Sequence, residues 1–205
     1  MTNDESNLLN KYLSNSSNYF EYGGGGSTYF ACTKSNLNHI YCVESNDQWI
    51  NKIKEQDICK KRFNNKKLIF FIIQINKNMS QNILANHLLI PENKVYQNNW
   101  EAYSSSISNL DTDTLNTIDF VLVDGRFRVG CTLMAIKYMN NNCYIAIHDF
   151  YFSGKSCNRY ETYCIVEKYL DKIEETGQLV IFKKKENIDY DLLMEDYHRM
   201  KYVPL

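Results

Sequence analysis

The sequence predicts an α/β fold in which a mostly parallel sheet is covered by helices on both faces. Along its 205 residues, apolar runs of strand length alternate with segments whose apolar residues recur at helical spacing. The run LIFFIIQI at residues 68–75 is almost entirely apolar, as strands buried on both faces tend to be. Four glycines separate the first expected strand from the helix that follows it. We therefore expect one domain, residues 1–205, built around one sheet.

The first half of the chain supplies three strands in this prediction. Its expected elements are a short helical segment within residues 1–17, a strand at 19–22, a helix from 27 or 28, a strand at 39–43, a helix at 48–55 and a strand at 68–75. Leu8, Leu9 and Leu13 recur at helical spacing, which indicates the N-terminal helix. Ser27 and Thr28 can cap free N–H groups, which places the next helix directly after the glycines.

The second half continues the alternation after a polar region at residues 76–116 that is irregular by sequence. Its expected elements are a helix around 103–110, a strand at 118–123, a helix at about 129–139, a strand at 144–147, a helix at 160–175 and a strand at 179–182, before a closing segment rich in Tyr and Met. The order of strands and helices favours parallel pairing, because a parallel connection needs a crossover that a helix can provide. The sequence shows no linker and no internal repeat.

Composition disfavours several classes of protein. Lys and Arg number 23 against 24 Asp and Glu, so the net charge of −1 offers no general field for phosphate, and we expect no nucleic-acid partner. The seven cysteines form an odd set without a C-x-x-C pair, and we interpret them as reduced, buried thiols. No apolar stretch reaches the roughly 18 residues of a transmembrane helix, so we expect a cytoplasmic protein without a membrane partner.

The stretch FEYGGGGSTYF, residues 20–30, places the four glycines where ligands bind in open parallel sheets, beyond the carboxyl end of a strand. Glycine tolerates positive φ and lets a ligand lie against bare backbone, while the helix behind it offers free N–H groups. Glu44 follows the second strand, 19 positions after Gly25, where a carboxylate can accept both hydroxyls of a ribose. The pattern predicts a nucleoside-binding site. The alternative is that the glycines form a tight turn with a purely structural role.

Three kinds of nucleoside site can be compared at this turn. A P-loop needs a Lys directly after its glycines, and none is present. A dinucleotide fingerprint, G-x-G-x-x-G/A, that starts at Gly23 reaches Thr28 at its third small position, which disfavours NAD. The remaining pattern is E-x-G-x-G-x-S at Glu21, Gly23, Gly25 and Ser27. A carboxylate before the turn would repel a pyrophosphate and attract an ammonium group.

This last pattern resembles motif I of the class I S-adenosylmethionine-dependent methyltransferases. The resemblance implies a Rossmann-like sheet of about seven strands whose last strand is antiparallel, and it implies S-adenosylmethionine as the cofactor. Glu21 would face the methionine amino group, and Glu44 would hold the ribose hydroxyls. The other residues of the predicted cofactor site are Gly23, Gly24 and Gly25 under the methionyl and ribose parts, Ser27, Thr28, Ser45, Asp124 and an adenine contact at Trp100, for which core packing is the alternative.

Two later motifs place polar residues at the ends of the next strands. VDGRFRV at 123–129 ends one strand in Asp124, and IHDFY at 147–151 ends the next in His148 and Asp149. Together with the pair Arg159-Tyr160, these motifs resemble a group of small, largely uncharacterised methyltransferase-like proteins, over residues 19 to about 170. Four consecutive glycines depart from that group, in which the middle position of G-x-G is usually bulkier.

These strand ends supply candidate catalytic residues. We predict His148 as a general base, since its ordinary pKa lies near neutrality, with Asp149 or Asp124 to orient it. The alternative for His148 is a structural bond to a loop carbonyl. Arg126 and Arg128 can clamp a carboxylate or phosphate on the acceptor, because a guanidinium binds oxyanions at two points. Their alternative is a salt bridge to Asp124 or Asp149 that sets the loop shape.

The acceptor pocket and any metal complete the predicted site. Arg159 and Tyr160 are predicted to line the acceptor pocket, the alternative being that they only begin a helix. In metal-dependent O-methyltransferases, acidic residues at the ends of these two strands hold Mg²⁺, and Asp124 and Asp149 would do so here. Because His148-Asp149 replaces the usual acidic pair, we expect no metal.

The predicted function is methyl transfer from S-adenosylmethionine to a small polar acceptor, with O-methylation of a sugar or nucleotide-sugar hydroxyl as the first choice. One alternative is a non-catalytic nucleoside-binding module of the same fold. Another is an NAD-dependent oxidoreductase, which Glu21 and Thr28 disfavour. The expected partner is a small-molecule or glycan acceptor, and a homodimer is compatible with the sequence.

Overall fold

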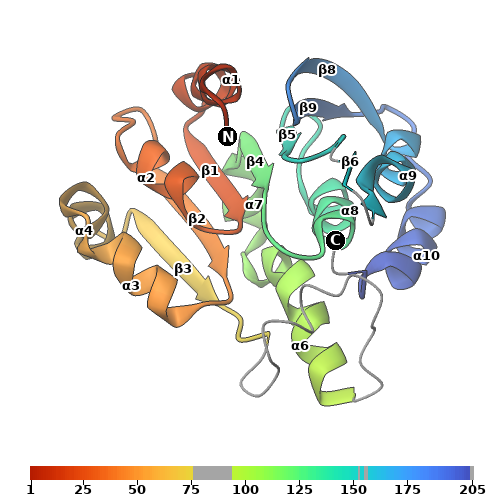
Figure 1. Ribbon diagram of the computed structural model, residues 1–205, viewed down its shortest axis with the longest axis horizontal. Coiled ribbons are helices and arrows are strands. Elements are labelled where there is room, and N and C mark those ends of the chain that lie inside the picture. The colour runs from red at the N-terminus through yellow and green to blue at the C-terminus, as the bar shows by residue number, and fades with distance from the viewer. Residues whose placement is uncertain (76–93, 152, 155–156, 204–205) are drawn as a thin grey trace.

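The structure is a computed structural model that describes residues 1–75, 94–151, 153–154 and 157–203. Seven strands form one sheet in the order β3-β2-β1-β4-β5-β9-β8 (Figure 1). In chain order they are β1 (Asn18–Tyr22), β2 (His39–Glu44), β3 (Leu68–Ile72), β4 (Phe120–Val123), β5 (Tyr144–Ile147), β8 (Leu170–Thr176) and β9 (Leu179–Lys184). The strands from β3 to β5 are parallel, and β9 is antiparallel to both β5 and β8. The predicted fold class is confirmed.

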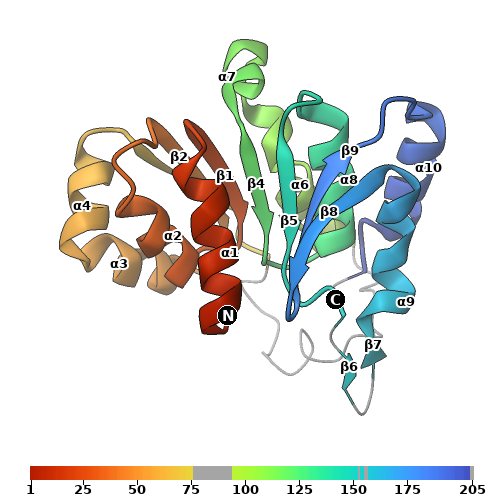
Figure 2. The same ribbon diagram turned by 90° about the horizontal axis from the view of Figure 1, so that it is seen from above.

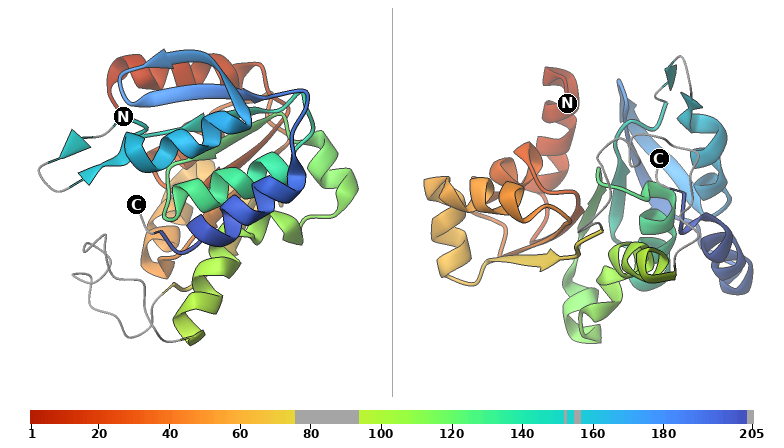
Figure 3. Two further views of the ribbon diagram at one scale, coloured as in Figure 1. Left: turned by 90° about the vertical axis from the view of Figure 1, so that its right-hand side faces the viewer. Right: turned by 60° about the horizontal axis from the view of Figure 1, so that its bottom comes forward.

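Helices cover both faces of this sheet (Figure 2). One face carries α1 (Asn3–Ser14), α2 (Gly26–Cys32), α3 (Asp47–Glu55) and α4 (Asp57–Asn64). The other carries α6 (Lys94–Ser104), α7 (Thr112–Thr117), α8 (Arg128–Tyr138), α9 (Arg159–Tyr163) and α10 (Tyr190–Met200), with the 3₁₀ turns η1 (Ser106–Asn109) and η2 (Cys164–Lys168). Figure 3 shows α6, α8 and α10 side by side on this second face. A small hairpin of β6 (Ser153–Gly154) and β7 (Cys157–Asn158) lies apart from the sheet.

Side chains of the central strands alternate between two apolar layers. In β1, Tyr19 packs in the layer under α1 to α4, whereas Phe20 and Tyr22 pack in the layer under α6 to α10. Every residue of β1 is buried, as expected for a strand that is covered on both faces. Glu21 alternates onto the same face as Tyr19 and is fully buried there. A carboxylate inside an apolar layer is costly unless its polar atoms are bonded, so Glu21 needs a specific explanation.

The helix predicted at 160–175 is wrong beyond its first turn. The α-helix ends at Tyr163, η2 continues to Lys168, and β8 occupies residues 170–176. Gly177, at φ +56°, forms the turn that returns the chain into β9, to which β8 pairs as an antiparallel strand. The open edge of β9 offers this segment a ladder of hydrogen bonds, and that tertiary partner outweighs the local helical pattern.

Two further expectations differ from the structure. The third strand ends at Ile72, which is 46% exposed, so the prediction of a strand buried on both faces is wrong: β3 is the outer strand of the sheet. The helix expected around 103–110 is also wrong, because α6 ends at Ser104 and only the short η1 follows before α7. Helices α4, α7 and α10 were not predicted. Residues 76–93 of the polar region lie outside the described residues.

The N-terminal segment is tied to the rest of the fold. In α1, Leu8, Leu9 and Leu13 are buried. The helix begins with a capping box, in which the side chain of Thr2 accepts the Glu5 N–H and the side chain of Glu5 accepts the Thr2 N–H.

Six of the cysteines are free thiols, and five of these are buried. In the described part of the chain, no helix has the length and apolar character needed to cross a membrane.

Candidate functional site

The glycine turn, residues 23–26, brings the ends of β1 and β4 into backbone contact. Gly23 lies at φ +92°, and its N–H donates to the carbonyl of Val43 at 2.8 Å. A Cβ added to Gly23 would stand 2.6 Å from the Cα of Gly125. Both the positive φ and this close approach exclude a side chain, which explains the glycine directly after β1. The loops after β1 and β4 therefore meet without any intervening side chain.

Glu44 and Trp49 bind the two backbone polar groups of Gly24, its N–H and its carbonyl. The N–H of Gly24 donates to Glu44 Oε2 at 3.0 Å, and Trp49 Nε1 donates to the carbonyl of Gly24 at 2.7 Å. The other oxygen of Glu44 accepts the backbone N–H groups of Ser45 at 2.6 Å and Asn46 at 2.9 Å. The Glu44 carboxylate thus faces the turn with backbone amides and the Ser45 hydroxyl as its hydrogen-bond donors.

Glu21 lies beneath the turn, fully buried. Its Oε2 accepts the Tyr19 hydroxyl at 3.0 Å and the Ser27 hydroxyl at 2.7 Å, while Oε1 is buried without a hydrogen-bond partner among the described residues. Burial raises the pKa of Glu21 to about 7, although the nearby hydroxyl groups of Thr28, Ser27 and Tyr19 act in the opposite direction. Oε1 therefore has hydrogen-bonding capacity that none of the described residues fills.

At the ends of β4 and β5, four side chains form what we call the ion-pair cluster: Asp124, Arg128, His148 and Asp149. The Arg128 guanidinium pairs with Asp149 Oδ2 at 2.9 Å and with Asp124 Oδ1 at 3.2 Å, and it also donates to the carbonyl oxygens of Gly125 and His148. His148 Nδ1 lies 3.0 Å from Asp124 Oδ1 and 3.5 Å from Asp149 Oδ1. Arg128 is therefore engaged in salt bridges within its own loop, the alternative that the sequence left open.

The second ring nitrogen of His148 meets a residue from the far end of the sequence. Glu5 of α1 brings Oε2 to 3.4 Å from His148 Nε2. Burial alone would lower the pKa of His148, but the hydrogen bond and charge of Asp124 and the charge of Asp149 outweigh it, so the pKa is raised. As the structure stands, both ring nitrogens face carboxylates.

The cluster fits a metal poorly. Ligand atoms of Asp124, His148 and Asp149 all lie within 4.8 Å of one another, a spacing that a divalent ion could bridge. However, the guanidinium of Arg128 already pairs with both carboxylates, and a second cation there would be repelled by it.

Other predicted site residues lie apart from these groups. Arg126 is exposed, and Arg159 begins α9 with its side chain outside the described atoms. Tyr160 packs against Phe150 and Tyr151, and its hydroxyl donates to Glu167 at 3.2 Å. Trp100 is buried 4.8 Å from the Phe127 ring, and its Nε1 has no hydrogen-bond partner among the described residues. Thr28 is the exception and lies at the glycine turn, where it is buried and its hydroxyl accepts the Gly25 N–H at 2.8 Å.

Sequence reasoning missed Trp49 and Glu5 as site residues. Trp49 is 43% exposed, and with Gly25 and Tyr29 it lines a 450 Å³ pocket beside the glycine turn. A T-x-x-E capping signature at Thr2 and Glu5 was present in the sequence, but it indicates only a helix start.

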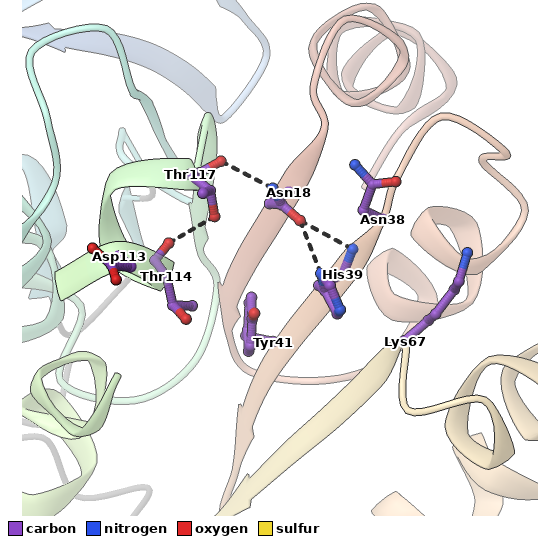
Figure 4. Close-up of a pocket in the computed structure, with 8 residues that line it drawn as sticks. All are labelled: Asn18, Asn38, His39, Tyr41, Lys67, Asp113, Thr114 and Thr117. Atoms are coloured by element: carbon purple, nitrogen blue, oxygen red, sulfur yellow. Dashed lines mark hydrogen bonds between the residues drawn. The ribbon is translucent and has the colours of Figure 1, made fainter. Parts of the chain in front are cut away.

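A second pocket, of 470 Å³, lies at the opposite ends of the strands (Figure 4). There the Asn18 side chain accepts the His39 N–H at 3.1 Å and donates to the Thr117 carbonyl at 3.1 Å. These bonds join the starts of β1 and β2 to the end of α7 (Figure 4). Asn18 is thus engaged in holding elements together, and we place the candidate site at the glycine turn.

Comparison with solved structures identifies the fold. A methyltransferase-like protein from Silicibacter pomeroyi DSS-3 superposes with a TM-score of 0.74 at 22% identity, covering 100% of this chain and 96% of that one. The chain has the fold of a methyltransferase-like protein. No protein-family model and no curated protein matches the sequence.

Enzymes that act on different atoms share the same fold. An O-methyltransferase from Bacillus cereus, in complex with S-adenosylhomocysteine, has a TM-score of 0.55 at 11% identity, covering 90% of this chain and 82% of that one. The N-methyltransferase NodS from Bradyrhizobium japonicum WM9, also in complex with S-adenosylhomocysteine, has a TM-score of 0.50 at 12% identity, covering 89% of this chain and 86% of that one. The fold therefore leaves the acceptor atom open.

Proposed function

We propose that the protein is an S-adenosylmethionine-dependent methyltransferase whose cofactor site is the glycine turn with Glu21 and Glu44. The observation that carries this proposal is the buried, unpartnered Oε1 of Glu21 beneath that turn. An ammonium group would supply the missing donor and favour the ionised carboxylate, whereas a pyrophosphate would be repelled. The fold, shared with proteins crystallised with S-adenosylhomocysteine, supports the same ligand.

The chain's own residues would divide the binding between them. Glu44 retains acceptor capacity beside the bare backbone of Gly24, as needed for the two hydroxyls of a ribose. Glu21 would accept from the amino group of the methionyl part. Bound S-adenosylmethionine supplies a methyl group on a sulfonium centre, which an acceptor can displace in line.

For the acceptor we propose a small polar molecule, with a sugar or nucleotide-sugar hydroxyl first. Arg126 is exposed at the end of β4 and is the residue we assign to an anionic group of such an acceptor. Arg128 is not available for that task, because it is paired within the ion-pair cluster. A non-catalytic nucleoside-binding module is the second candidate, and it is favoured by one observation: both ring nitrogens of His148 already face carboxylates.

Calorimetric titration of the purified protein with S-adenosylmethionine, S-adenosylhomocysteine and NAD tests the cofactor assignment. We expect the two sulfur nucleosides to bind, NAD not to bind, and Glu44→Gln to weaken nucleoside binding at least about tenfold, since a carboxylate-to-hydroxyl bond is worth about 1.5–3 kcal/mol. Glu186→Gln, a matched change at an exposed glutamate, should bind like the wild type. Equal affinities for Glu44→Gln and the wild type would contradict the assignment, as would tight binding of NAD.

A further inference from the structure

We propose that Glu5, on the N-terminal helix, is a positioning residue of the candidate site that fixes the imidazole of His148 and holds it in the doubly protonated form. The contact joins residues 143 positions apart, with His148 Nε2 at 3.4 Å from Glu5 Oε2. Glu5 is 2% exposed, so water does not screen the contact as it does on the surface. The contact and the protonation state of His148 do not depend on the proposed function. Only their consequence for methyl transfer rests on it.

The Glu5 carboxylate is held from two separate segments. Its Oε2 accepts the Thr2 N–H at 2.6 Å, and its Oε1 accepts the Gln178 N–H at 2.7 Å from the turn between β8 and β9. In that turn a Cβ on Gly177 would stand 2.6 Å from Glu5 Oε1, so the glycine makes room for the carboxylate. A side chain fixed in this way presents its remaining lone pairs to His148 in one orientation.

The hydrogen-bond chemistry of the ring selects its protonation state. A neutral imidazole has one N–H and one bare nitrogen, and a carboxylate can only accept. Asp124 faces Nδ1 at 3.0 Å and Glu5 faces Nε2 at 3.4 Å, so both contacts are hydrogen bonds only when both nitrogens carry a proton. With either neutral tautomer, a bare nitrogen would face a carboxylate oxygen.

The surrounding charges favour the same state. Among the described residues, the charged groups around the ring are Glu5 from α1, Asp124 from the end of β4, Arg128 from α8 and Asp149 after β5. The turn between β8 and β9 contributes only the uncharged Gly177 and Gln178 to this region. Three carboxylates thus meet one guanidinium, and a positive charge on His148 offsets the excess of negative charge.

This arrangement gives His148 a role other than that of a base. An imidazolium already carries a proton on each ring nitrogen, so it cannot take a proton from an acceptor until one of its own protons has left. In a methyltransferase, His148 would then position Asp124 and contribute positive charge, with α1 as a structural part of the site. The sequence-based prediction of His148 as general base is replaced by this role in our proposal.

Long-range ¹H–¹⁵N NMR correlation of the histidine ring nitrogens tests the inference. It needs neither a ligand nor a reaction, so its outcome does not depend on whether the protein binds S-adenosylmethionine. His148 would be assigned by its absence in His148→Gln, and spectra would be compared from pH 5 to 9 for the wild type, Glu5→Gln and Asp4→Asn. Asp4 lies in the same helical turn and is exposed, so its variant removes one negative charge without touching His148.

In the wild type we expect both His148 nitrogens to carry protons at pH 7.5, about one unit above the ordinary pKa of a histidine. In Glu5→Gln, the protonation constant of His148 should fall about tenfold, while Asp4→Asn should leave it unchanged, because an opposite charge within about 4 Å shifts a pKa by about 1 to 3 units. A wild-type spectrum with one bare nitrogen at pH 7.5 would overturn the proposal, even if Glu5→Gln failed to fold. So would unchanged titration in a folded Glu5→Gln.

Discussion

The two sides of the candidate site differ in what compensates their acidic groups. At the glycine turn, Glu21 and Glu44 accept hydrogen bonds from hydroxyl and backbone N–H groups, and in the described part of the chain no ion pair joins either one. In the ion-pair cluster, Asp124 and Asp149 are bound by Arg128 and by the His148 ring. Both sides lie at the carboxyl ends of neighbouring strands, yet among the described residues only the second side has cationic side chains of its own.

The difference indicates which side is built to receive a ligand. A buried carboxylate without a counter-charge carries a cost that a bound cation or hydroxyl group can relieve. Carboxylates already paired with a guanidinium have little left to gain from a ligand and instead fix the shape of their loops. We therefore propose that a ligand binds at the glycine turn and that the ion-pair cluster serves rigidity.

The largest expected effect comes from removing the cation of the cluster. Arg128→Met should lower the free energy of unfolding at pH 7 by about 4 kcal/mol, because breaking a buried ion pair leaves its carboxylates uncompensated. Arg126→Met, two residues earlier and exposed, should change it by less than about 0.5 kcal/mol. Urea denaturation of both variants measures the difference. If both variants changed the free energy of unfolding by similarly small amounts, Arg128 would not be the group that compensates the carboxylates of the cluster.

The next effect concerns the uncompensated side. The pKa of Glu21 is raised to about 7 in the folded protein, so its contribution to stability is fully present below its ordinary value of 4.5 and is lost as the pH rises through 7. Relative to Glu21→Gln, the wild type should therefore lose about 3 kcal/mol of unfolding free energy between pH 4.5 and pH 8. Urea denaturation across this range measures it, with Glu186→Gln as the control. Parallel pH profiles for Glu21→Gln and the wild type would refute a buried, uncompensated Glu21.

The smallest effect tests the close approach that links the two sides. Gly23→Ala should destabilise the fold by about 2 kcal/mol, because φ is +92° and the new Cβ would stand 2.6 Å from the Cα of Gly125. Gly26→Ala is the matched control: a Cβ there has no neighbour within 4 Å, and Gly26 is the first residue of α2, so stability should rise by up to about 0.5 kcal/mol. Thermal denaturation of both variants measures the contrast, and equal losses would mean that the turn has no special geometry.

Local patterns in the sequence predicted much of the site. The acidic residue before the turn, the four glycines and Glu44 could be placed together, because the carboxyl ends of parallel strands meet at one edge of the sheet. The same reasoning brought Asp124 and His148 to that edge. It could not decide whether Arg128 would meet a ligand or its neighbours, since a guanidinium three positions after a glycine can reach either.

By itself, the sequence determined the alternation of strands and helices, the position of the glycine turn, and the acidic residues at strand ends, because burial and turn chemistry act over short stretches of chain. Only the tertiary structure decided that residues 170–176 form a strand, since the open edge of β9 supplied a partner for them. Tertiary structure alone also brought Glu5 to His148 across 143 positions. That contact depends on where α1 packs on the finished sheet, which no local pattern encodes.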